Sequence, residues 1–249
     1  MSTPGMPSGT NEEELAPGQP SAARTKRIFA AIAPSYSLFN TLSSFGLDRL
    51  WRRRAVRSAA LTPRSEVLDL AAGTADFTLA LARHGRPRSI LATDLVPEML
   101  EVGRQQVAKY HGGTTIDFAV VDAQDLPFAD ASFDAVTVAF GVRNMPERAA
   151  NFSEVRRVLR PGGRYVILEF SQPSLGLLRP VYEFYLNRVI PLLGVLVTRD
   201  RSSYEYLKES ILGFPPHDAL AAELTAAGFR SVSWERLTFG TVAVHVAEV

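Results

Sequence analysis

The chain contains no cysteine, and this absence removes several classes of function at once. Without a thiol the protein has no disulfide framework, no thiolate metal site and no cysteine nucleophile. Net charge is also nearly absent, because 27 Lys and Arg residues stand against 26 Asp and Glu residues, a formal net charge of +1. A protein whose main partner is nucleic acid usually carries a stronger basic excess, so no nucleic-acid partner is expected. No metal is expected either.

Long apolar runs are missing as well. A membrane-spanning helix needs about 20 uninterrupted apolar residues. The nearest stretch, Leu175–Val197, is interrupted by Arg179, Glu183 and Arg188. Residues 1–24 are rich in Pro, Gly and Ser and lack the apolar core of a secretory signal, so we expect a disordered tail. Together with the lack of cysteine, these features favour a cytoplasmic protein.

The remainder, residues 25–249, is expected to fold as one domain in which apolar runs alternate with helical segments. The first runs expected as strands are Val67–Leu70, Ser89–Thr93, Ile116–Val121, Phe133–Phe140 and Tyr165–Phe170. Continuous apolar strands separated by helices indicate a parallel sheet that is covered on both faces. Two further runs, Ser231–Arg236 and Thr241–Ala247, lie so close in sequence that they must pair antiparallel. We therefore predict an α/β fold with a seven-stranded doubly wound sheet and a terminal antiparallel hairpin.

Two regions outside this sheet are predicted to be helical. They are residues 25–62, with a turn or cap at Asn40–Ser43, and an aromatic-rich insert over residues 171–216. In the first region the run Trp51–Arg54, followed by Arg57, makes one helix basic. A solvated helix face is the simpler interpretation, and an anion or membrane contact is the alternative.

The end of one later helix is marked by a Pro-Gly-Gly sequence. Phe152, Val155 and Leu159 recur at helical spacing, and Arg160–Gly163 follows directly. Because proline and glycine interrupt helices, this helix is predicted to include Leu159 and to end there.

The most informative local feature is the turn after the first apolar run. Very small residues, Ala71–Thr74, connect that run to a helix start at Asp76, and Asp94 ends the next run. In open parallel sheets ligands lie beyond the carboxyl ends of the strands, where the strand order reverses. The turn, Asp94, and the pair Asp122 and Ala123 after the third run are therefore predicted to surround one crevice.

The residues of this turn discriminate between cofactors. Aligned on Gly73, the three glycine positions of a dinucleotide-binding turn hold Ala71, Gly73 and Asp76. The third position should be small, and a carboxylate there would compete with a pyrophosphate for the amides of the helix N-terminus. The turn instead suits a nucleoside without phosphate that ends in an amino acid, as S-adenosylmethionine does.

In that interpretation each element of the crevice has a role. Asp94 accepts hydrogen bonds from the ribose hydroxyls, Asp122 and Ala123 flank the adenine, and Thr74 with the turn amides of Ala71–Gly73 holds the amino-acid end. The alternative is that Asp69, Asp76 and Asp94 are only helix and turn caps.

Several motifs outside the turn resemble one known family. They are Tyr36–Ser43 continuing to Trp51, Phe140–Asn144, Arg157–Gly163 continuing to Ser171, Tyr204–Ile211, and Val242–His245. On these motifs the chain resembles the UbiE/MenG family, the S-adenosylmethionine-dependent C-methyltransferases of ubiquinone and menaquinone biosynthesis. The resemblance implies a class I S-adenosylmethionine-dependent methyltransferase fold and a polyprenylated quinol as substrate. It also implies cofactor contacts at Thr74, Asp94, Asp122 and Ala123.

The chain departs from this family at four positions. Ser37 stands where many members have Asp, Asp48 where His is usual, Ala139 where some have Ser, and Ala75 where a second glycine is usual. These departures bear on the substrate more than on the cofactor, and naphthoquinol and benzoquinol both remain open.

Two residues directly after the fourth run are our candidates for catalysis. We hypothesise that Arg143 stabilises the phenolate of the substrate and that Asn144 fixes its position. A hydrogen bond that merely fixes the loop is an equally good interpretation. His217, Tyr204 and His245 are expected to have structural roles.

The insert raises the question of partners. Its apolar part, Leu177–Val197, would provide a groove for a prenyl tail or a peripheral contact with a membrane surface. An equal alternative is that it packs against the core or against a second subunit in a homodimer. Other functions also remain open at this point, namely methylation of a soluble natural product and a binding protein that has lost its chemistry.

Overall fold

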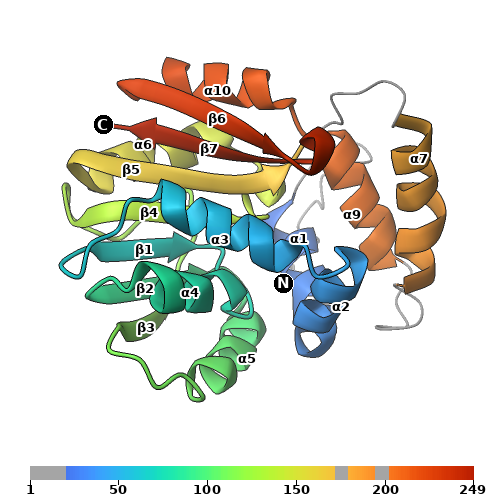
Figure 1. Ribbon diagram of the computed structural model, residues 1–249, viewed down its shortest axis with the longest axis horizontal. Helices are drawn as coiled ribbons and strands as arrows, with labels where there is room; N and C mark the ends of the chain where they lie inside the picture. The colour runs from blue at the N-terminus through green and yellow to red at the C-terminus, as the bar shows by residue number, and fades with distance from the viewer. Residues whose placement is uncertain (1–20, 172–178, 194–201) are drawn as a thin grey trace, which may run out of the picture.

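The computed structural model describes residues 21–171, 179–193 and 202–249, and a single β-sheet lies at its centre (Figure 1). Within the described residues the sheet has seven strands in the order β3-β2-β1-β4-β5-β7-β6. The strands are β1 (Glu66–Leu70), β2 (Ser89–Asp94), β3 (Thr115–Val120), β4 (Phe133–Ala139), β5 (Leu159–Phe170), β6 (Ser231–Leu237) and β7 (Val242–Glu248). The first five strands pair in parallel, whereas β7 runs antiparallel to both β5 and β6. The predicted sheet and its terminal hairpin are thereby confirmed.

The strand order reverses between β1 and β4, and helices cover both faces. One face carries α3 (Asp48–Ser58) and α4 (Asp76–Ala80), the latter continued by a π-helical turn. The other carries α6 (Arg148–Val158) and α10 (His217–Ala226). A further helix, α5 (Pro97–Val107), contacts β2 and β3. The reversal is where such sheets bind ligands, because neighbouring crossovers leave on opposite faces there.

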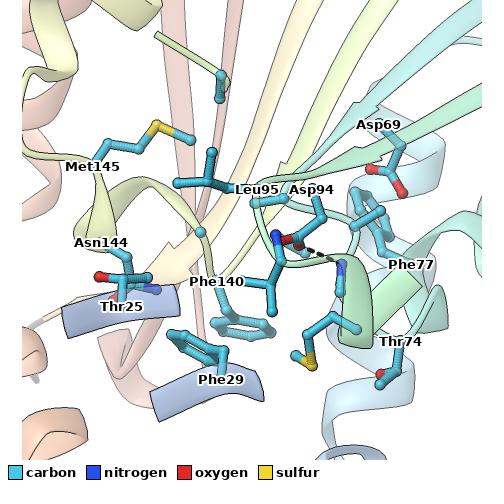
Figure 2. Close-up of a pocket in the computed structure, with 18 of the residues that line it drawn as sticks. Thr25, Phe29, Asp69, Thr74, Phe77, Asp94, Leu95, Phe140, Asn144 and Met145 are labelled. Carbon is cyan, nitrogen blue, oxygen red and sulfur yellow. Dashed lines mark hydrogen bonds between the residues drawn. The ribbon is translucent and has the colours of Figure 1, made fainter. Parts of the chain in front are cut away.

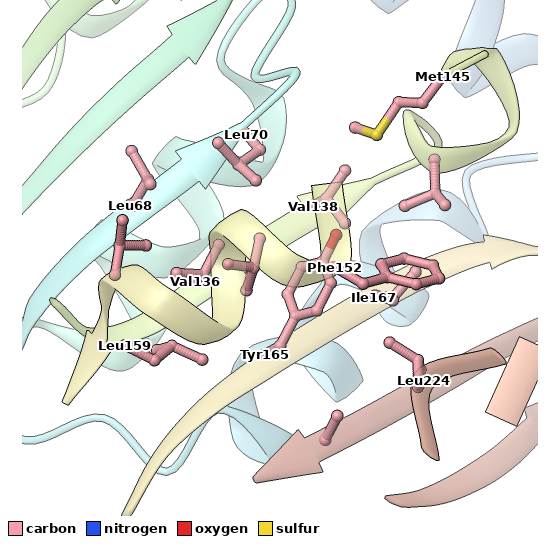
Figure 3. Close-up of a cluster of buried hydrophobic side chains, with 14 of the residues drawn as sticks. Leu68, Leu70, Val136, Val138, Met145, Phe152, Leu159, Tyr165, Ile167 and Leu224 are labelled. Carbon is pink, nitrogen blue, oxygen red and sulfur yellow. The ribbon is translucent and has the colours of Figure 1, made fainter. Parts of the chain in front are cut away.

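The side chains of the central strands alternate between two hydrophobic cores. We call the core against α6 and α10 the first core and the core against α3 and α4 the second core. Leu68, Val136 and Tyr165 pack with the α6 and α10 side chains, as Figure 3 shows. Their neighbours Val67 and Ala135 pack instead with α3 and α4. Successive side chains of a strand point to opposite faces, so a sheet covered on both sides requires the continuous apolar runs seen in the sequence.

Helices from both flanking regions gather at the carboxyl ends of the parallel strands (Figure 1). They are α1 (Ala22–Ile32), α2 (Tyr36–Ser43), α7 (Arg179–Phe184) with its π-helical continuation, and α9 (Ser202–Leu212). The helix α1 begins three residues before the expected end of the tail, and residues 1–20 lie outside the described part. No helix among the described residues is long and apolar enough to cross a membrane.

Two boundaries predicted from the sequence are wrong. Asn40–Ser43 forms the last turn of α2, and the chain reverses after it. There Gly46 has a φ of 76° and donates its amide to the Thr41 carbonyl at 2.8 Å, a left-handed helix ending that glycine favours. Leu159 belongs to β5 and pairs with Phe133, so α6 ends one residue earlier than predicted. Leu159 is buried in either conformation, which is why helical spacing alone misplaced it.

Truncation of Phe152, the aromatic side chain that α6 places in the first core, should test how far the stability of the fold depends on this core. Phe152 is 1% exposed among strand and helix side chains. We expect Phe152→Ala to lower the free energy of unfolding by roughly 3–5 kcal/mol in a urea titration, because it leaves a cavity. The matched control Phe184→Ala, at a side chain that is 63% exposed, should change it by no more than about 0.5 kcal/mol. Equal losses in the two variants would contradict this account of the core.

Candidate functional site

The turn between β1 and α4 has an unusually tight backbone. Ala71, Gly73 and Ala75 all have left-handed φ angles, of 47°, 55° and 65°. Two of these are alanines, which adopt this conformation only at an energetic cost, and such strain concentrates at functional sites. Gly103 of α5 lies directly against the turn, because a Cβ there would be 3.2 Å from the Ala75 Cβ and 3.3 Å from the Gly73 carbonyl oxygen. Small residues are therefore required on both sides of this contact.

The carboxylate of Asp94 is fixed at the end of β2 by this turn. The Gly73 amide donates to its Oδ2 at 2.8 Å, drawn as a dashed line in Figure 2, and the Val96 amide donates to its Oδ1 at 2.9 Å. Burial raises the pKa of Asp94 to about 6, against the lowering effect of these amide hydrogen bonds. Each carboxylate oxygen can accept two hydrogen bonds, so both retain acceptor capacity toward the cavity.

Two neighbouring amides of the turn also have acceptors within the protein. Ala72 donates to the Thr93 carbonyl and Ala75 to the Ala72 carbonyl, both at 2.9 Å. Since Gly73 donates to Asp94, these three amides are not available to a ligand. The amino-acid end of a cofactor is therefore expected to meet side chains of the turn and amides other than these three.

A small polar network links the turn to α2. Asp76 Oδ2 accepts hydrogen bonds from Ser37 Oγ at 2.7 Å and from Thr74 Oγ1 at 3.0 Å. Gln106 of α5 donates to Ser37 Oγ at 3.1 Å. Ser37, one of the four departures from the family pattern, thus anchors α2 above the turn.

Capping does not explain the three aspartates. Asp69 accepts hydrogen bonds from Thr78 at 2.6 Å and Thr137 at 2.7 Å, which tie β1 to α4 and to β4. Burial raises the pKa of Asp69 to about 6. Asp76 caps no helix, and only the Asp94 bond to Val96 has the character of a cap. The interpretation of the three aspartates as caps therefore explains only one of the hydrogen bonds that Asp94 accepts, and none of those that Asp69 and Asp76 accept.

The predicted crevice exists as one cavity at the reversal of the strand order (Figure 2). Its walls include every residue expected at the cofactor, namely Ala71, Gly73, Thr74, Asp94, Asp122 and Ala123, and also Asn144. Thr25 and Phe29 of α1 close it from the side opposite Thr74 and Asp69, a contribution that local sequence patterns did not indicate. We refer to it as the first cavity.

The charge of the first cavity is negative. Its walls hold four carboxylates, Asp69, Asp76, Asp94 and Asp122, against the single cation Arg52. Arg52 is itself paired with Asp48, the residue that stands where the family usually has His. Such a wall repels a pyrophosphate and attracts a cationic ligand, which agrees with the choice of cofactor made from the turn.

A buried hydrogen-bond chain holds the far wall of the first cavity. Gln124 donates its backbone and side-chain amides to Asp122 Oδ1 at 2.9 and 3.1 Å. Asn151 of α6 donates to the Ala123 carbonyl at 2.7 Å and accepts from the Tyr165 hydroxyl at 2.8 Å. The wall is thereby connected to the centre of the first core.

Arg143 and Asn144 lie in a 3-10 turn after β4 but face different surroundings. Asn144 borders the first cavity, and its Oδ1 accepts a hydrogen bond from Tyr206 of α9 at 3.0 Å. The side chain of Arg143 is 2% exposed and pairs with Glu169 of β5, Nη1 to Oε1 at 2.9 Å. Burial lowers the pKa of Arg143 and the Glu169 charge raises it, with a net rise, so the guanidinium stays protonated. Glu169 sits within an apolar run, and this interruption was the only sequence signal for its role.

Arg143 lines a second cavity, which is mainly aromatic. Its walls include Phe39, Trp51, Phe140, Phe170, Tyr182 and Tyr185. The Phe140 ring lies 4.8 Å from that of Phe170 and 6.2 Å from that of Trp51, measured between ring centroids. Phe140 and Tyr36 belong to the walls of both cavities, so the two adjoin. The Nε atom of Arg143 is buried and has no hydrogen-bond partner among the described residues.

His245 and His217, for which structural roles were expected, contact each other and the surrounding core. His245 is 2% exposed, and its Nε2 lies 2.8 Å from the His217 carbonyl oxygen. Burial lowers the pKa of His245 to about 4. The His217 ring packs against Trp234, with ring centroids 4.2 Å apart. The side chain of Tyr204 lies outside the described residues, and in the part of the chain that is described no group of carboxylates and histidines could hold a metal ion.

The insert packs partly against the protein's own helices. Leu186 and Ile190 are buried in a cluster with Phe39 of α2 and Ile211 of α9. Leu192, two residues after Ile190, is 62% exposed. Residues 172–178 and 194–201 of the insert lie outside the described residues, so the groove expected over residues 177–197 is described only in part.

The sequence is similar to that of known proteins over most of its length. A model of the ubiE/COQ5 methyltransferase family matches residues 19–248. The demethylmenaquinone methyltransferase of Thermus thermophilus is 44% identical over 221 residues, which cover 89% of this chain and 99% of the relative. The ubiquinone/menaquinone biosynthesis C-methyltransferase UbiE of Geotalea daltonii is 41% identical over 226 residues, 90% of this chain and 96% of the relative.

A solved structure agrees on the fold. A SAM-dependent methyltransferase from Aquifex aeolicus superposes with a TM-score of 0.59 at 15% identity, and the match covers 85% of this chain and 96% of that one. At this identity the likeness concerns the fold alone, and it confirms the predicted class I methyltransferase architecture.

The buried Arg143–Glu169 pair allows a prediction about stability. Glu169→Ala should lower the free energy of unfolding, measured in urea, by roughly 3–5 kcal/mol, because it leaves the buried charge of the Arg143 guanidinium without its partner. The double variant Arg143→Met with Glu169→Leu should lose less than this single variant, since it removes both charges. As a control, Glu223→Ala breaks the partly exposed pair with Arg148 and should cost about 1 kcal/mol or less. A double variant as unstable as the sum of its two single changes would contradict the prediction.

Proposed function

The chain belongs to the ubiE/COQ5 methyltransferase family, and we propose that it methylates a ring carbon of a polyprenylated quinol with S-adenosylmethionine as methyl donor. The conversion of demethylmenaquinol to menaquinol is the main reaction, and the benzoquinol of the ubiquinone pathway is a further substrate of the same chemistry. The observation that carries this proposal is the pair of adjoining cavities, one acidic and one aromatic, that share Phe140 and Tyr36.

The first cavity fits the methyl donor. When bound, S-adenosylmethionine supplies an electrophilic methyl group on a positively charged sulfur. Asp94 would accept the ribose hydroxyls with its remaining lone pairs, and Asp122 and Ala123 would flank the adenine. Thr74 and Asp76 would hold the amino-acid end, because the amides of Ala72, Gly73 and Ala75 are already used. The carboxylate-rich wall suits a cationic ligand.

The second cavity would hold the quinol ring beside Arg143. Loss of a ring-hydroxyl proton moves electron density onto the adjacent ring carbon, which is the nucleophile that the reaction needs. Arg143 stays protonated and is a poor base, so its role is to stabilise the phenolate. Glu169 positions the guanidinium, and Asn144, held by Tyr206, borders the place where the two ligands meet. Orientation of this kind can contribute roughly 7–11 kcal/mol to lowering a reaction barrier.

The prenyl tail would leave the second cavity along the insert, where Leu186 and Ile190 form part of the apolar wall. The same region was expected to provide a peripheral membrane contact or a dimer interface. The burial of these two side chains against Phe39 and Ile211 supports packing within the subunit at this point.

The decisive assay supplies labelled S-adenosylmethionine and a chemically reduced demethylated quinone. We expect label on a ring carbon, and Arg143→Lys should lower kcat at least tenfold with the cofactor Kd unchanged, because an ammonium does not reproduce the guanidinium contacts. Arg148→Lys, outside both cavities, is the matched control. Label found only on oxygen or nitrogen, or turnover only with substrates that lack a tail, would replace the proposal by methylation of a soluble compound.

The raised pKa of Asp94 predicts a pH-dependent cofactor affinity. Only the ionised carboxylate accepts both ribose hydroxyls, so affinity is full above a pKa of about 6 and is lost as the pH falls through it. Between pH 7 and pH 5 the Kd measured by titration calorimetry should rise about tenfold, as one pH unit below a controlling pKa implies. Asp94→Asn should bind weakly at both values, whereas Asp69→Asn should keep the dependence. A flat profile in the unaltered protein would exclude this role of Asp94.

A further inference from the structure

Apolar side chains are exposed together at the corner between α2 and α3. Leu38, Leu42, Phe45 and Leu50 are exposed by 57%, 44%, 78% and 57%. Single exposed hydrophobic residues are common on protein surfaces. These four lie close in sequence, and Leu38 and Leu42 are four residues apart on one side of α2. We call these four residues the apolar corner.

The tip of the apolar corner is also conformationally costly. Phe45 has a φ of 52°, a left-handed conformation that a bulky residue rarely adopts and that glycine or asparagine adopts more easily. Its ring touches Tyr185, with centroids 6.3 Å apart, yet remains mostly in water. A sequence shaped by folding stability alone would not place an exposed phenylalanine there.

A basic groove runs beside the apolar corner. Leu38 and Thr41 of α2 form one side of it, and Arg49, Arg53, Arg83 and Lys109 contribute four cations, of which Arg53 donates a hydrogen bond to His84 at 3.2 Å. Within the described residues none of these four side chains forms an ion pair with a carboxylate.

The acids of this groove do not neutralise it. Asp48 is buried in its pair with Arg52, and Asp76 accepts hydrogen bonds from Ser37 and Thr74. His84 also lines the groove, and its pKa is lowered by burial and then by the surrounding arginines, of which Arg53 comes first. His84 therefore reports a locally positive surface in a chain whose net charge is only +1.

We propose that the apolar corner and the basic groove dock together on the surface of an anionic phospholipid bilayer. Phe45, Leu42 and Leu50 would enter the interface, and the cations of the groove would meet lipid phosphates. Exposed apolar side chains flanked by arginine and lysine are the combination that binds such surfaces. A second copy of this chain is disfavoured, because a two-fold contact would set the same cations against each other.

The apolar corner lies beside the second cavity, which indicates what the docking would achieve. Ser43 and Ser44, which lie between Leu42 and Phe45 in the sequence, line the second cavity, as does Tyr185, which contacts Phe45. Docking would therefore bring that cavity against the bilayer, where the tail of a prenylated quinol resides. This last step rests on the proposed function, whereas the docking itself does not.

The test measures binding of the full chain to lipid vesicles by flotation, without substrate. Vesicles of phosphatidylcholine with about one-third phosphatidylglycerol should bind the protein, less so as salt rises, and pure phosphatidylcholine should not. Phe45→Asn should fold normally, because asparagine tolerates the left-handed backbone, but should bind at least tenfold more weakly. Arg49→Gln with Arg53→Gln should also weaken binding and reduce its salt dependence.

Matched controls come from other surfaces. Phe184→Ser removes an exposed ring from α7, and the double variant Arg156→Gln with Arg230→Gln removes two exposed cations from the α6 and α10 side. Both control variants should bind vesicles as the unaltered protein does. Equal binding to both vesicle types, or full binding by Phe45→Asn, would overturn the proposal. Two other results, each without vesicle binding, would also overturn it. One is a dimer of this chain that Phe45→Asn dissociates, and the other is binding of an acidic protein to this surface.

Turnover separates this proposal from the proposed function. Phe45→Asn should methylate a soluble short-tailed quinol at the normal rate and a long-tailed quinol in anionic vesicles at least fivefold more slowly. If neither quinol is methylated by the unaltered protein, the proposed function fails while the vesicle result still decides the docking.

Discussion

The hydrogen bond from the Gly73 amide to the Asp94 carboxylate is the contact on which the shape of the first cavity depends. It joins the ends of two neighbouring strands and requires three left-handed residues in a turn of only small side chains. The close approach of Gly103 in α5 follows from the same constraint. A half-buried carboxylate is thereby held in place, with a raised pKa and with lone pairs that face a cavity. Fold stability alone would not require such an arrangement.

The Arg143–Glu169 pair performs the corresponding task in the second cavity. A buried ion pair adds little to stability, because the cost of removing both charges from water offsets their attraction. Its value lies in fixing a guanidinium beside an aromatic space, with one nitrogen that has no partner in the part of the chain that the structure describes. Together the two constraints place an acidic cavity next to an aromatic one, and Phe140 forms part of both walls.

Much of this arrangement was predictable, and the failures have physical reasons. The strands, the terminal hairpin and the gathering of Thr74, Asp94, Asp122 and Ala123 around one cavity followed from apolar runs and from the shared edge at which parallel strands end. The helix end at Leu159 was misplaced because a buried leucine fits a helix and a strand equally well. Arg143 and Asn144 were correctly placed after β4, but their separation into two cavities was not foreseen.

The sequence by itself determined the alternation of elements and the small-residue turn, because both depend on local periodicity and on the backbone freedom of neighbouring residues. Only the tertiary structure decided which distant side chains meet. Glu169 pairs with Arg143, Tyr206 holds Asn144, and the α2–α3 corner gathers its apolar and basic side chains beside the second cavity. These contacts join segments far apart in the chain, and the packing of the helices at the carboxyl edge of the sheet sets them, which no local pattern encodes.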